Sequence, residues 1–324
     1  MKKNNNLKGK NILITGGSGM IARQLINLLL KEEALINIAD LKKPNNLSPQ
    51  INFHKVDLKN YHECLRITKS IDYVFNLVGI KCSPKMCFEN PANIIGPMLQ
   101  FNTNMLEAAM FNNVEWYLYT SSIGVYDPSE VMSEESVWNT YPSKNDWYGG
   151  WAKRIGELQC QAYEIQNGEG KCSIVRPANT YGPYDNFDLQ SAMVIPSLIR
   201  KASDNKELEV WGDGSEIRDF IYSKDVARGM IHALKNKITE PINLGSGLGY
   251  SISAIAEIIA NHYGKNIKWI NSDTTGDRKR LLNMKKAKEN GFKISVSIHD
   301  GIINTINWYE KNKKIILDEY FAFK

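Results

Sequence analysis

The 324-residue chain is predicted to fold as an α/β protein with a doubly wound parallel sheet. Two observations support this prediction. A glycine-rich turn joins the first β-rich run to a helical pattern, and strand-like runs then alternate with helical ones. The strand-like runs cover residues 11–15, 35–39, 51–56, 73–78, 116–120 and 171–175, and helical patterns cover 98–109 and the residues after Trp151.

The pattern changes after residue 178. Loops and short helical runs follow at 194–201, 253–263 and 302–311, which indicates a smaller second lobe. No obvious linker separates the two patterns, so we expect them to be interleaved. The prediction is a nucleotide-binding domain over 1–178 and a mainly substrate-binding lobe over 179–324, with some segments of the second part returning to the first domain.

The first turn predicts a Rossmann-type dinucleotide site. An apolar strand-like run ends at Thr15 and is followed by Gly-Gly-Ser-Gly and a helical pattern. Gly16 permits the tight turn, and Gly19 permits the close approach of a pyrophosphate. The free N–H groups of Met20 and Ile21, at the start of the helix, would hold its negative charge.

The second strand-like run ends at Asp40, about 20 residues further on, where an acid is expected to bind the ribose hydroxyls of the cofactor. A carboxylate there also repels a 2′-phosphate, which favours NAD over NADP. Lys42 and Lys43 nearby reduce that repulsion.

Further candidate residues follow other predicted strands. Ligands of doubly wound sheets bind outside the carboxyl ends of the strands, so these residues should line one cleft. The candidates for the cofactor are Asp57, Leu58, Leu77, Val78, Gly79 and Pro177, while Ser122 and Asn179 would face the substrate.

Composition excludes several classes of function. The formal charge of +5 is spread over dispersed lysines without an aromatic-interleaved basic run, so a nucleic-acid partner is not expected. The five histidines are scattered, which excludes a metal site of ordinary ligand spacing. The five cysteines form no C-x-x-C pair, and the sequence has neither a signal-peptide core nor a run of about 18 apolar residues. We therefore expect a cytoplasmic protein with reduced thiols and no membrane association.

Five motifs, taken together, resemble a known family. They are residues 15–21, 121–126, 153–157, 176–183 and 211–219, and they look like those of the extended short-chain dehydrogenases/reductases that act on nucleotide sugars. The resemblance covers nearly the whole chain. Within the family, residues 181–187 followed by Val-Ile-Pro are most similar to the GDP-L-fucose synthases, with the UDP-galactose 4-epimerases more distant.

The resemblance implies catalysis by a Ser/Thr, a Tyr and a Lys. Ser122 would steady the sugar oxygen, and Lys153 would hold the nicotinamide ribose and lower the pKa of a neighbouring phenol. The phenol is expected four residues before the lysine, but Gly149 stands there. Tyr148 is rotated by a further ~100° on a regular helix. Two adjacent glycines could delay the helix start or allow a bulge that brings Tyr148 to the cofactor; otherwise water or Ser122 must take the proton.

The residues after Ser122 narrow the chemistry. Relatives that dehydrate or decarboxylate carry acids where this chain has Ile123 and Gly124. The cysteine and histidine that the fucose synthases use for epimerisation are replaced by Gly124 and Met193. What remains is hydride transfer at a single carbon, C4, by an NAD-dependent nucleotide-sugar 4-epimerase or 4-oxidoreductase. The alternative is a catalytically impaired NAD(H)-binding sensor or partner subunit, which Gly149 would favour.

Substrate binding is expected from five residues. Arg218 and Arg280 match positions where relatives bind the diphosphate, which suits a guanidinium fork. Asn179 would donate to phosphate or sugar, Trp211 would pack on the base, and Val194 belongs to the same pocket by resemblance. The resemblance implies that the nucleotide is GDP or UDP. The apolar stripe of Met98, Phe101, Met105, Leu106 and Met110, together with the resemblance, predicts helix pairing in a homodimer.

Overall fold

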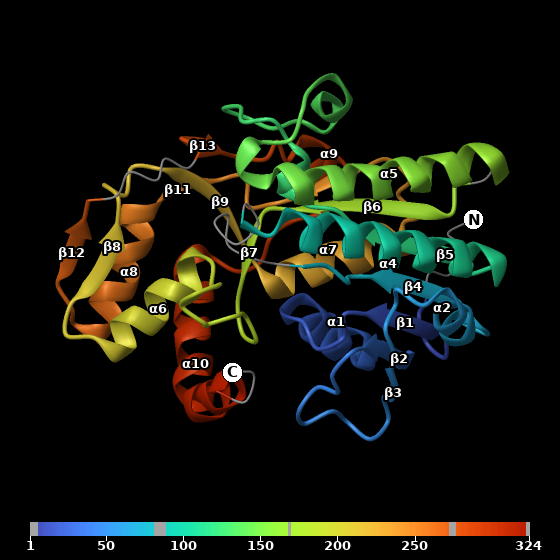
Figure 1. Ribbon diagram of the computed structural model, residues 1–324, viewed down its shortest axis with the longest axis horizontal. Coiled ribbons are helices and arrows are strands. Elements are labelled where there is room, and N and C mark those ends of the chain that lie inside the picture. Colours follow the sequence, from blue (N-terminus) through green and yellow to red (C-terminus); the bar gives the residue numbers. More distant parts are fainter. Residues whose placement is uncertain (1–5, 81–88, 168–169, 272–276, 322–324) are drawn as a thin grey trace.

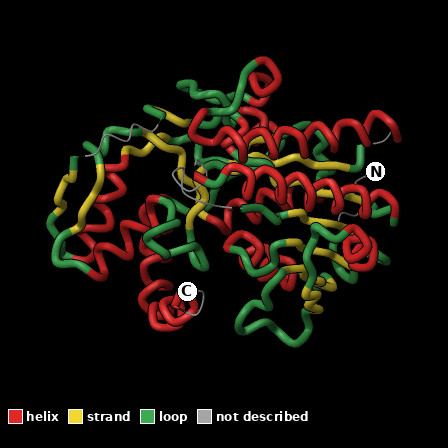
Figure 2. Tube along the Cα trace, in the orientation of Figure 1, coloured by secondary structure: helices red, strands yellow, loops and turns green. Residues whose placement is uncertain are grey.

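The larger lobe is built on a seven-stranded parallel sheet (Figures 1 and 2). The structure is a computed structural model that describes residues 6–80, 89–167, 170–271 and 277–321. The strand order is β10-β6-β5-β4-β1-β2-β3, so the winding reverses between β1 and β4 and the predicted doubly wound sheet is confirmed. The strands are β1 Asn11–Thr15, β2 Leu35–Asp40, β3 Asn52–Lys55, β4 Tyr73–Asn76, β5 Trp116–Thr120, β6 Cys172–Pro177 and β10 Ile242–Leu244.

Helices cover both faces of this sheet, as its parallel strands require. On one face, α1 (Met20–Lys31) packs beside α7 (Ser223–Lys235), and their buried side chains share one core with β1 and β2. On the other face lie α2 (Tyr61–Thr68), α4 (Pro91–Phe111) and α5 (Trp147–Asn167). The carboxyl ends of the strands point toward the second lobe (Figure 1).

The apolar stripe on α4 lies in this second core. Met98, Phe101, Met105 and Leu106 are buried, and the partly buried Met110 packs against the same cluster. The stripe therefore holds α4 against its own chain, and it does not supply the dimer surface that we predicted from it. The periodicity of a helix shows that one face is covered but not by which chain.

The second lobe has a separate core and its own small sheets. A four-stranded sheet contains β7 (Asn179–Tyr181), β9 (Ile217–Tyr222), β11 (Gly249–Ser251) and β13 (Lys279–Arg280). A two-stranded sheet pairs β8 (Leu208–Trp211) with β12 (Ile267–Ile270). The helices α6 (Val194–Asp204), α8 (Ile252–Tyr263) and α10 (Ile298–Phe321) pack around them.

The chain passes between the lobes several times. Strand β6 ends at Pro177, and β7 begins in the other sheet at Asn179. After β9 the chain returns through α7 and β10 to the main sheet. The short helix α9 (Lys285–Glu289) then packs near β10. Every helix among the described residues is too short or too polar to cross a membrane.

Candidate functional site

The glycine turn is packed tightly against the end of β4. Gly16 has a φ of +65°, and a Cβ there would lie 3.2 Å from backbone atoms of Val78, so only glycine suits the position. The Thr15 hydroxyl oxygen accepts hydrogen bonds from the N–H groups of Leu77 at 3.1 Å and Val78 at 3.2 Å. The turn and the residues predicted from the end of β4 are therefore neighbours.

The first turn of α1 is open to an anion. Gly19 is the N-cap residue and provides no side-chain cap, so the N–H groups of Met20 and Ile21 remain available. Beside them, the Asp40 carboxylate accepts hydrogen bonds from the Ser18 N–H at 2.9 Å and the Ser18 hydroxyl at 2.6 Å. Asp40 thus lies at the edge of the glycine turn, the position expected for contact with a ribose.

The remaining residues predicted for the cofactor lie at strand ends of the main sheet. Leu58 is buried after β3, while Asp57 is exposed and forms an ion pair of 3.3 Å with Lys59. Gly79 is exposed after β4, and Pro177 is the buried last residue of β6.

Lys153 extends from α5 to the ends of two strands. Its Nζ donates a 2.7 Å hydrogen bond to the Thr120 carbonyl at the end of β5. A Cβ on Gly79, after β4, would lie 3.7 Å from the same Nζ. Burial lowers the pKa of Lys153 to about 8, and the nearby Glu157 carboxylate opposes that change. The ammonium group is therefore located where the cofactor-side residues converge.

Ser122 lies just beyond the end of β5. It is the N-cap of a short 3-10 helix, Ile123–Val125, and its Oγ accepts a 3.0 Å hydrogen bond from the Gly124 N–H. Because its hydroxyl oxygen is the acceptor in this bond, its O–H remains able to donate to a ligand. Ser122 is partly exposed, in contrast to its buried neighbour Ser121.

The start of α5 decides where Tyr148 lies. The helix begins at Trp147 and continues through both glycines, so the structure does not show the delayed start that could carry Tyr148 to the cofactor. Tyr148 is 38% exposed. A Cβ on Gly150 would collide with the Gly124 carbonyl and Pro142, whereas one on Gly149 would have no atom within 4 Å. The place expected for a catalytic tyrosine is thus open space.

The two arginines predicted to bind a diphosphate are adjacent. Arg218 on β9 and Arg280 on β13 are paired in register in parallel strands. The Arg280 Nη2 donates a 3.2 Å hydrogen bond to the Ile123 carbonyl, next to Ser122 in the chain. Burial and the charge of Arg280 lower the pKa of Arg218. Two cations held side by side favour an anion between or beside them.

Arg280 is already paired with carboxylates in this structure. Its Nη1 lies 2.5 Å from Oδ2 of Asp146, and its Nε lies 3.7 Å from the Asp277 carboxylate. Asp146 ends the 3-10 helix Lys144–Asp146, directly before α5. We did not single out either acid from the sequence. Asp146 precedes Lys153 by seven residues, about two helical turns, and that spacing could have drawn attention to it.

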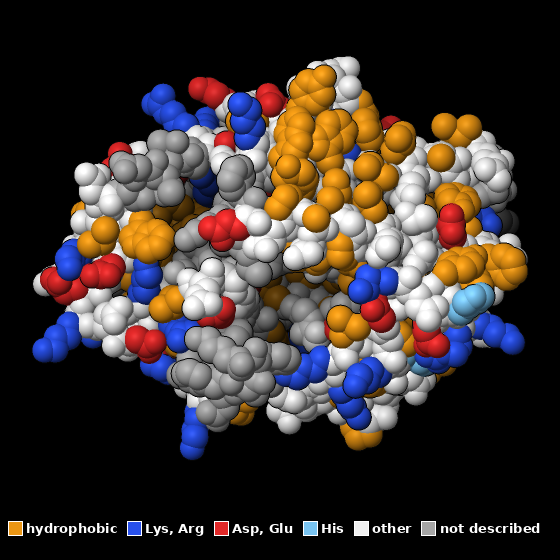
Figure 3. All heavy atoms as spheres, viewed as in Figure 1, with side chains coloured by type: hydrophobic (Ala, Val, Ile, Leu, Met, Phe, Trp, Pro, Cys, Tyr) orange, Lys and Arg blue, Asp and Glu red, His pale blue; other side chains and the backbone are white. Residues whose placement is uncertain are grey.

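The other predicted substrate residues lie further along the second lobe. The Asn179 amide donates a 2.9 Å hydrogen bond to the Asp219 carbonyl and so ties β7 to β9. Val194 is exposed at the first position of α6. Trp211 is 66% exposed, with the Lys201 ammonium 4.7 Å from its ring centre. The space-filling view shows a hollow between the lobes (Figure 3).

A buried ion pair between Arg176 and Glu157 holds the segments that carry the site residues in place. Arg176 on β6 donates to both oxygens of Glu157 on α5, at 2.9 and 2.6 Å, and Ser121 also donates to Glu157. The same guanidinium donates to the Tyr126 hydroxyl at 2.9 Å and the Glu134 carbonyl at 3.0 Å. Arg176 therefore fixes α5, which carries Lys153, relative to the loop after Ser122.

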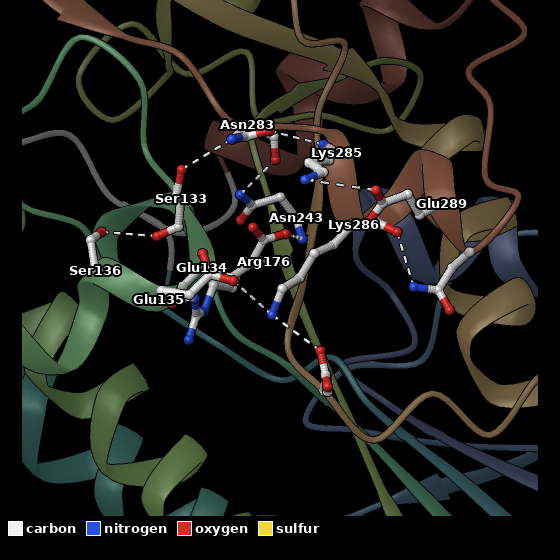
Figure 4. A network of polar contacts seen from close by, with 12 residues as sticks. Ser133, Glu134, Glu135, Ser136, Arg176, Asn243, Asn283, Lys285, Lys286 and Glu289 are labelled. Carbon is white, nitrogen blue, oxygen red and sulfur yellow. Dashed lines mark hydrogen bonds and ion pairs between the residues drawn. The ribbon is translucent and has the colours of Figure 1, made fainter.

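The same loop is connected to β10 and the start of α9 (Figure 4). The buried Glu134 side chain accepts a 2.9 Å hydrogen bond from the Asn243 N–H, and burial raises the pKa of Glu134. The Asn283 amide donates to Ser133 at 3.1 Å, and Lys286 pairs with Glu135 at 2.9 Å. These contacts join segments more than 100 residues apart and hold the loop in one position.

The fold and these residues define a class of protein. It is a Rossmann-type enzyme in which the strand ends that carry the glycine turn face a small second lobe with two adjacent arginines. The chain belongs to the NAD dependent epimerase/dehydratase family, whose model matches residues 12–245. Membership in this family confirms the resemblance stated from the motifs and identifies NAD as the cofactor.

Curated relatives match over nearly the full length. The chain is 31% identical over 317 residues to GDP-L-fucose synthase of Sinorhizobium fredii, covering 94% of this chain and 97% of that protein. It is 28% identical over 321 residues to GDP-mannose 3,5-epimerase 1 of Oryza sativa subsp. indica, covering 93% and 82%. Among solved structures, an epimerase of Methanothermobacter thermautotrophicus has a TM-score of 0.85 at 26% identity, covering 97% and 96%.

Proposed function

We propose that this enzyme transfers a hydride at C4 of a nucleoside-diphosphate sugar, as an NAD-dependent 4-epimerase or 4-oxidoreductase. One observation carries the proposal: Arg280 of the second lobe donates to the Ile123 carbonyl, directly after Ser122, and Lys153 of the first lobe donates to the Thr120 carbonyl, two residues before Ser122. A diphosphate held by Arg218 and Arg280 would therefore place its sugar close to the serine hydroxyl. The names of the two curated relatives favour GDP as the nucleotide.

Each residue of the site has a defined task in this reaction. Bound NAD supplies the hydride acceptor, and the glycine turn, α1 and Asp40 would hold its pyrophosphate and ribose. The Ser122 hydroxyl donates to the sugar oxygen and steadies the charge that develops there. The Lys153 ammonium favours negative charge at the same end of the sheet, where its Nζ meets the end of β5, and its burial strengthens that electrostatic effect.

The side chains near Ser122 argue against reactions that need a further acid or base. Ile123 is a buried apolar residue, and Gly124 has no side chain with which to move a proton. Met193, the N-cap residue of α6, stands where the resemblance places a histidine. We therefore propose that the enzyme lacks the epimerisation for which fucose synthases use a cysteine and a histidine.

The proposal is tested with a panel of GDP- and UDP-sugars and NAD. We expect NADH absorbance, or a C4-epimerised product seen by NMR, with at least one GDP-sugar. Arg218→Ala should weaken nucleotide-sugar binding by about 1.5–3 kcal/mol, the value for a charged hydrogen bond, while NAD binding stays unchanged. Equal nucleotide-sugar affinity in wild type and variant would contradict the proposed pocket.

A second candidate is favoured by Gly149, since the tyrosine position is empty. In that case the protein is a catalytically impaired NAD(H)-binding sensor or partner subunit. Tight NAD binding without turnover of any sugar in the panel would support this candidate. We also propose a homodimer, on the strength of the family resemblance alone; a monomer by light scattering at micromolar concentration would contradict it.

A further inference from the structure

The Asp146 carboxylate lies on the same side of Gly124 as Ser122, the serine proposed to be catalytic. A Cβ on Gly124 would lie 3.4 Å from the Asp146 Cγ and also 3.4 Å from the Ser122 Oγ. Both groups thus border the same point beside Gly124, on the side of the loop where the Ser122 hydroxyl lies. Because position 124 is glycine, no side chain fills the gap between them.

Asp146 is held in position and still has an oxygen available. Its Oδ2 receives the 2.5 Å contact from Arg280, and its backbone N–H donates a 2.9 Å hydrogen bond to the Ser143 carbonyl. Within the described part of the chain, Oδ1 accepts no hydrogen bond. The side chain is 36% exposed, so a ligand can reach it. In Figure 1 the start of α5 lies beside β13, at the boundary of the two lobes.

We propose that Asp146 is the general base of this enzyme and serves in place of the missing tyrosine. The inference rests on the proposed hydride transfer at C4. In the oxidative direction the Asp146 carboxylate takes the proton of the sugar hydroxyl and becomes a carboxylic acid. The C4–H electron pair leaves as hydride to the oxidised nicotinamide, and the C4–O bond becomes a carbonyl. In the reverse direction the carboxylic acid returns its proton to the sugar oxygen.

The diphosphate and Asp146 share one cation. Substrate phosphates that bind Arg218 and Arg280 compete with Asp146 for the Arg280 guanidinium. A bound substrate therefore loosens the ion pair and frees Oδ2 in addition to Oδ1. This link between diphosphate binding and the base follows from the 2.5 Å contact between Asp146 and Arg280.

Asp277 provides a matched control, because it also lies against Arg280. Its two oxygens already accept hydrogen bonds from the Ser143 hydroxyl, at 3.1 and 2.9 Å, and from the Asn145 amide at 3.0 Å. The side-chain atoms that border position 124 belong to Asp146 and Ser122. If the acids serve only to orient Arg280, replacing either one should have similar effects.

The test compares Asp146→Asn with Asp277→Asn in the full chain with NAD and the active sugar of the panel. We expect Asp146→Asn to lower kcat about 100-fold or more, the ordinary contribution of a general base, with a much smaller loss for Asp277→Asn. Calorimetry with GDP alone should show equal or tighter binding to Asp146→Asn, because a competing carboxylate is removed. Equal kcat losses in the two variants, or an unchanged kcat in Asp146→Asn, would overturn the proposal.

Two further variants keep the outcome clear if the asparagine variant folds poorly. In Asp146→Ala, added formate should restore part of the lost kcat, since it can occupy the space of the carboxylate. In a Gly149→Tyr background, Asp146→Asn should cost less than in wild type, because a phenol now takes the proton. If neither effect is seen, the proposed role of Asp146 is wrong, while the proposed hydride transfer is unaffected. A wild-type protein that turns over no sugar in the panel contradicts the proposed function, and this inference with it.

Discussion

Placing a tyrosine at position 149 is the most informative single change in this enzyme. Position 149 lies on α5, four residues before Lys153, so its side chain projects from the same helix face. The structure provides space, because a Cβ there meets no atom within 4 Å. Replacing a helical glycine also favours the helix by roughly half a kcal/mol. Gly149→Tyr should therefore fold and place a phenol near Lys153 and Ser122.

The size of the effect depends on the base that is already present. Adding a general base to a site with none is worth ~100- to 10,000-fold. In our account Asp146 already accepts the proton, although a carboxylate is a weaker base than a phenolate. We therefore expect kcat to rise about tenfold, which corresponds to roughly 1.4 kcal/mol of activation free energy.

The assay is single-turnover formation of NADH or of the 4-keto sugar, which separates chemistry from product release. Gly149→Phe is the matched control, since it adds the ring without the hydroxyl. Tyr148→Phe tests the remaining native phenol and should change kcat little, because the helix leaves Tyr148 off the Lys153 face. Equal rates in the Gly149→Tyr and Gly149→Phe variants would refute the reasoning, as would a 100-fold loss in Tyr148→Phe.

Three other predictions concern charge. Burial lowers the pKa of Lys153 to about 8, so kcat/KM should fall as pH rises through about 8. Lys153→Arg should move this decline to higher pH. A flat profile of kcat/KM from pH 7 to 10 would contradict the role given to Lys153. Asp40→Asn should reduce the preference for NAD over NADP at least about tenfold in titration calorimetry, because the carboxylate that repels the 2′-phosphate of NADP is removed. Equal affinities of the wild-type protein for NAD and NADP would rule out this role of Asp40. Arg176→Met leaves Glu157 buried and unpaired, so it should destabilise the protein by about 3–5 kcal/mol in urea unfolding. Adding Glu157→Gln to this variant should recover part of the lost stability. An unchanged unfolding midpoint in Arg176→Met would show that the ion pair contributes nothing to stability.

The pH dependence of stability has a defined sign for Lys153. Its folded pKa of about 8 lies below the ordinary lysine value of 10.5, so the unfolded chain binds more protons between these pH values. The buried charge therefore costs stability below pH 8, and that cost is relieved as pH rises from 8 toward 10.5. This contribution runs opposite to the activity, which needs the charged lysine.

Local sequence patterns were sufficient for much of the fold. The glycine turn, the acid at the end of β2 and the alternation of strands and helices are signals within about 40 residues. The motif around Ser122 and the position of Lys153 also follow from short segments. These parts could be predicted because their geometry is set by neighbours in the chain.

Long-range contacts account for what sequence patterns missed. Arg280 reaches Asp146 and the Ile123 carbonyl only because β13 pairs with β9, and these partners are 134 and 157 residues away in the chain. No local pattern indicates that pairing. The stripe on α4 was misassigned for the same reason, because its partner is the rest of its own lobe.

The most direct test of the central claim follows the hydrogen at C4 of the sugar. The active GDP-sugar is prepared with deuterium at C4 and incubated with the enzyme and NAD, and both products are analysed by NMR and mass spectrometry. Hydride transfer at C4 predicts deuterium in the reduced nicotinamide for net oxidation, or deuterium retained at C4 of the epimerised sugar for redox-neutral epimerisation. Loss of the deuterium to solvent, or product formation with the change at another carbon, would contradict the account.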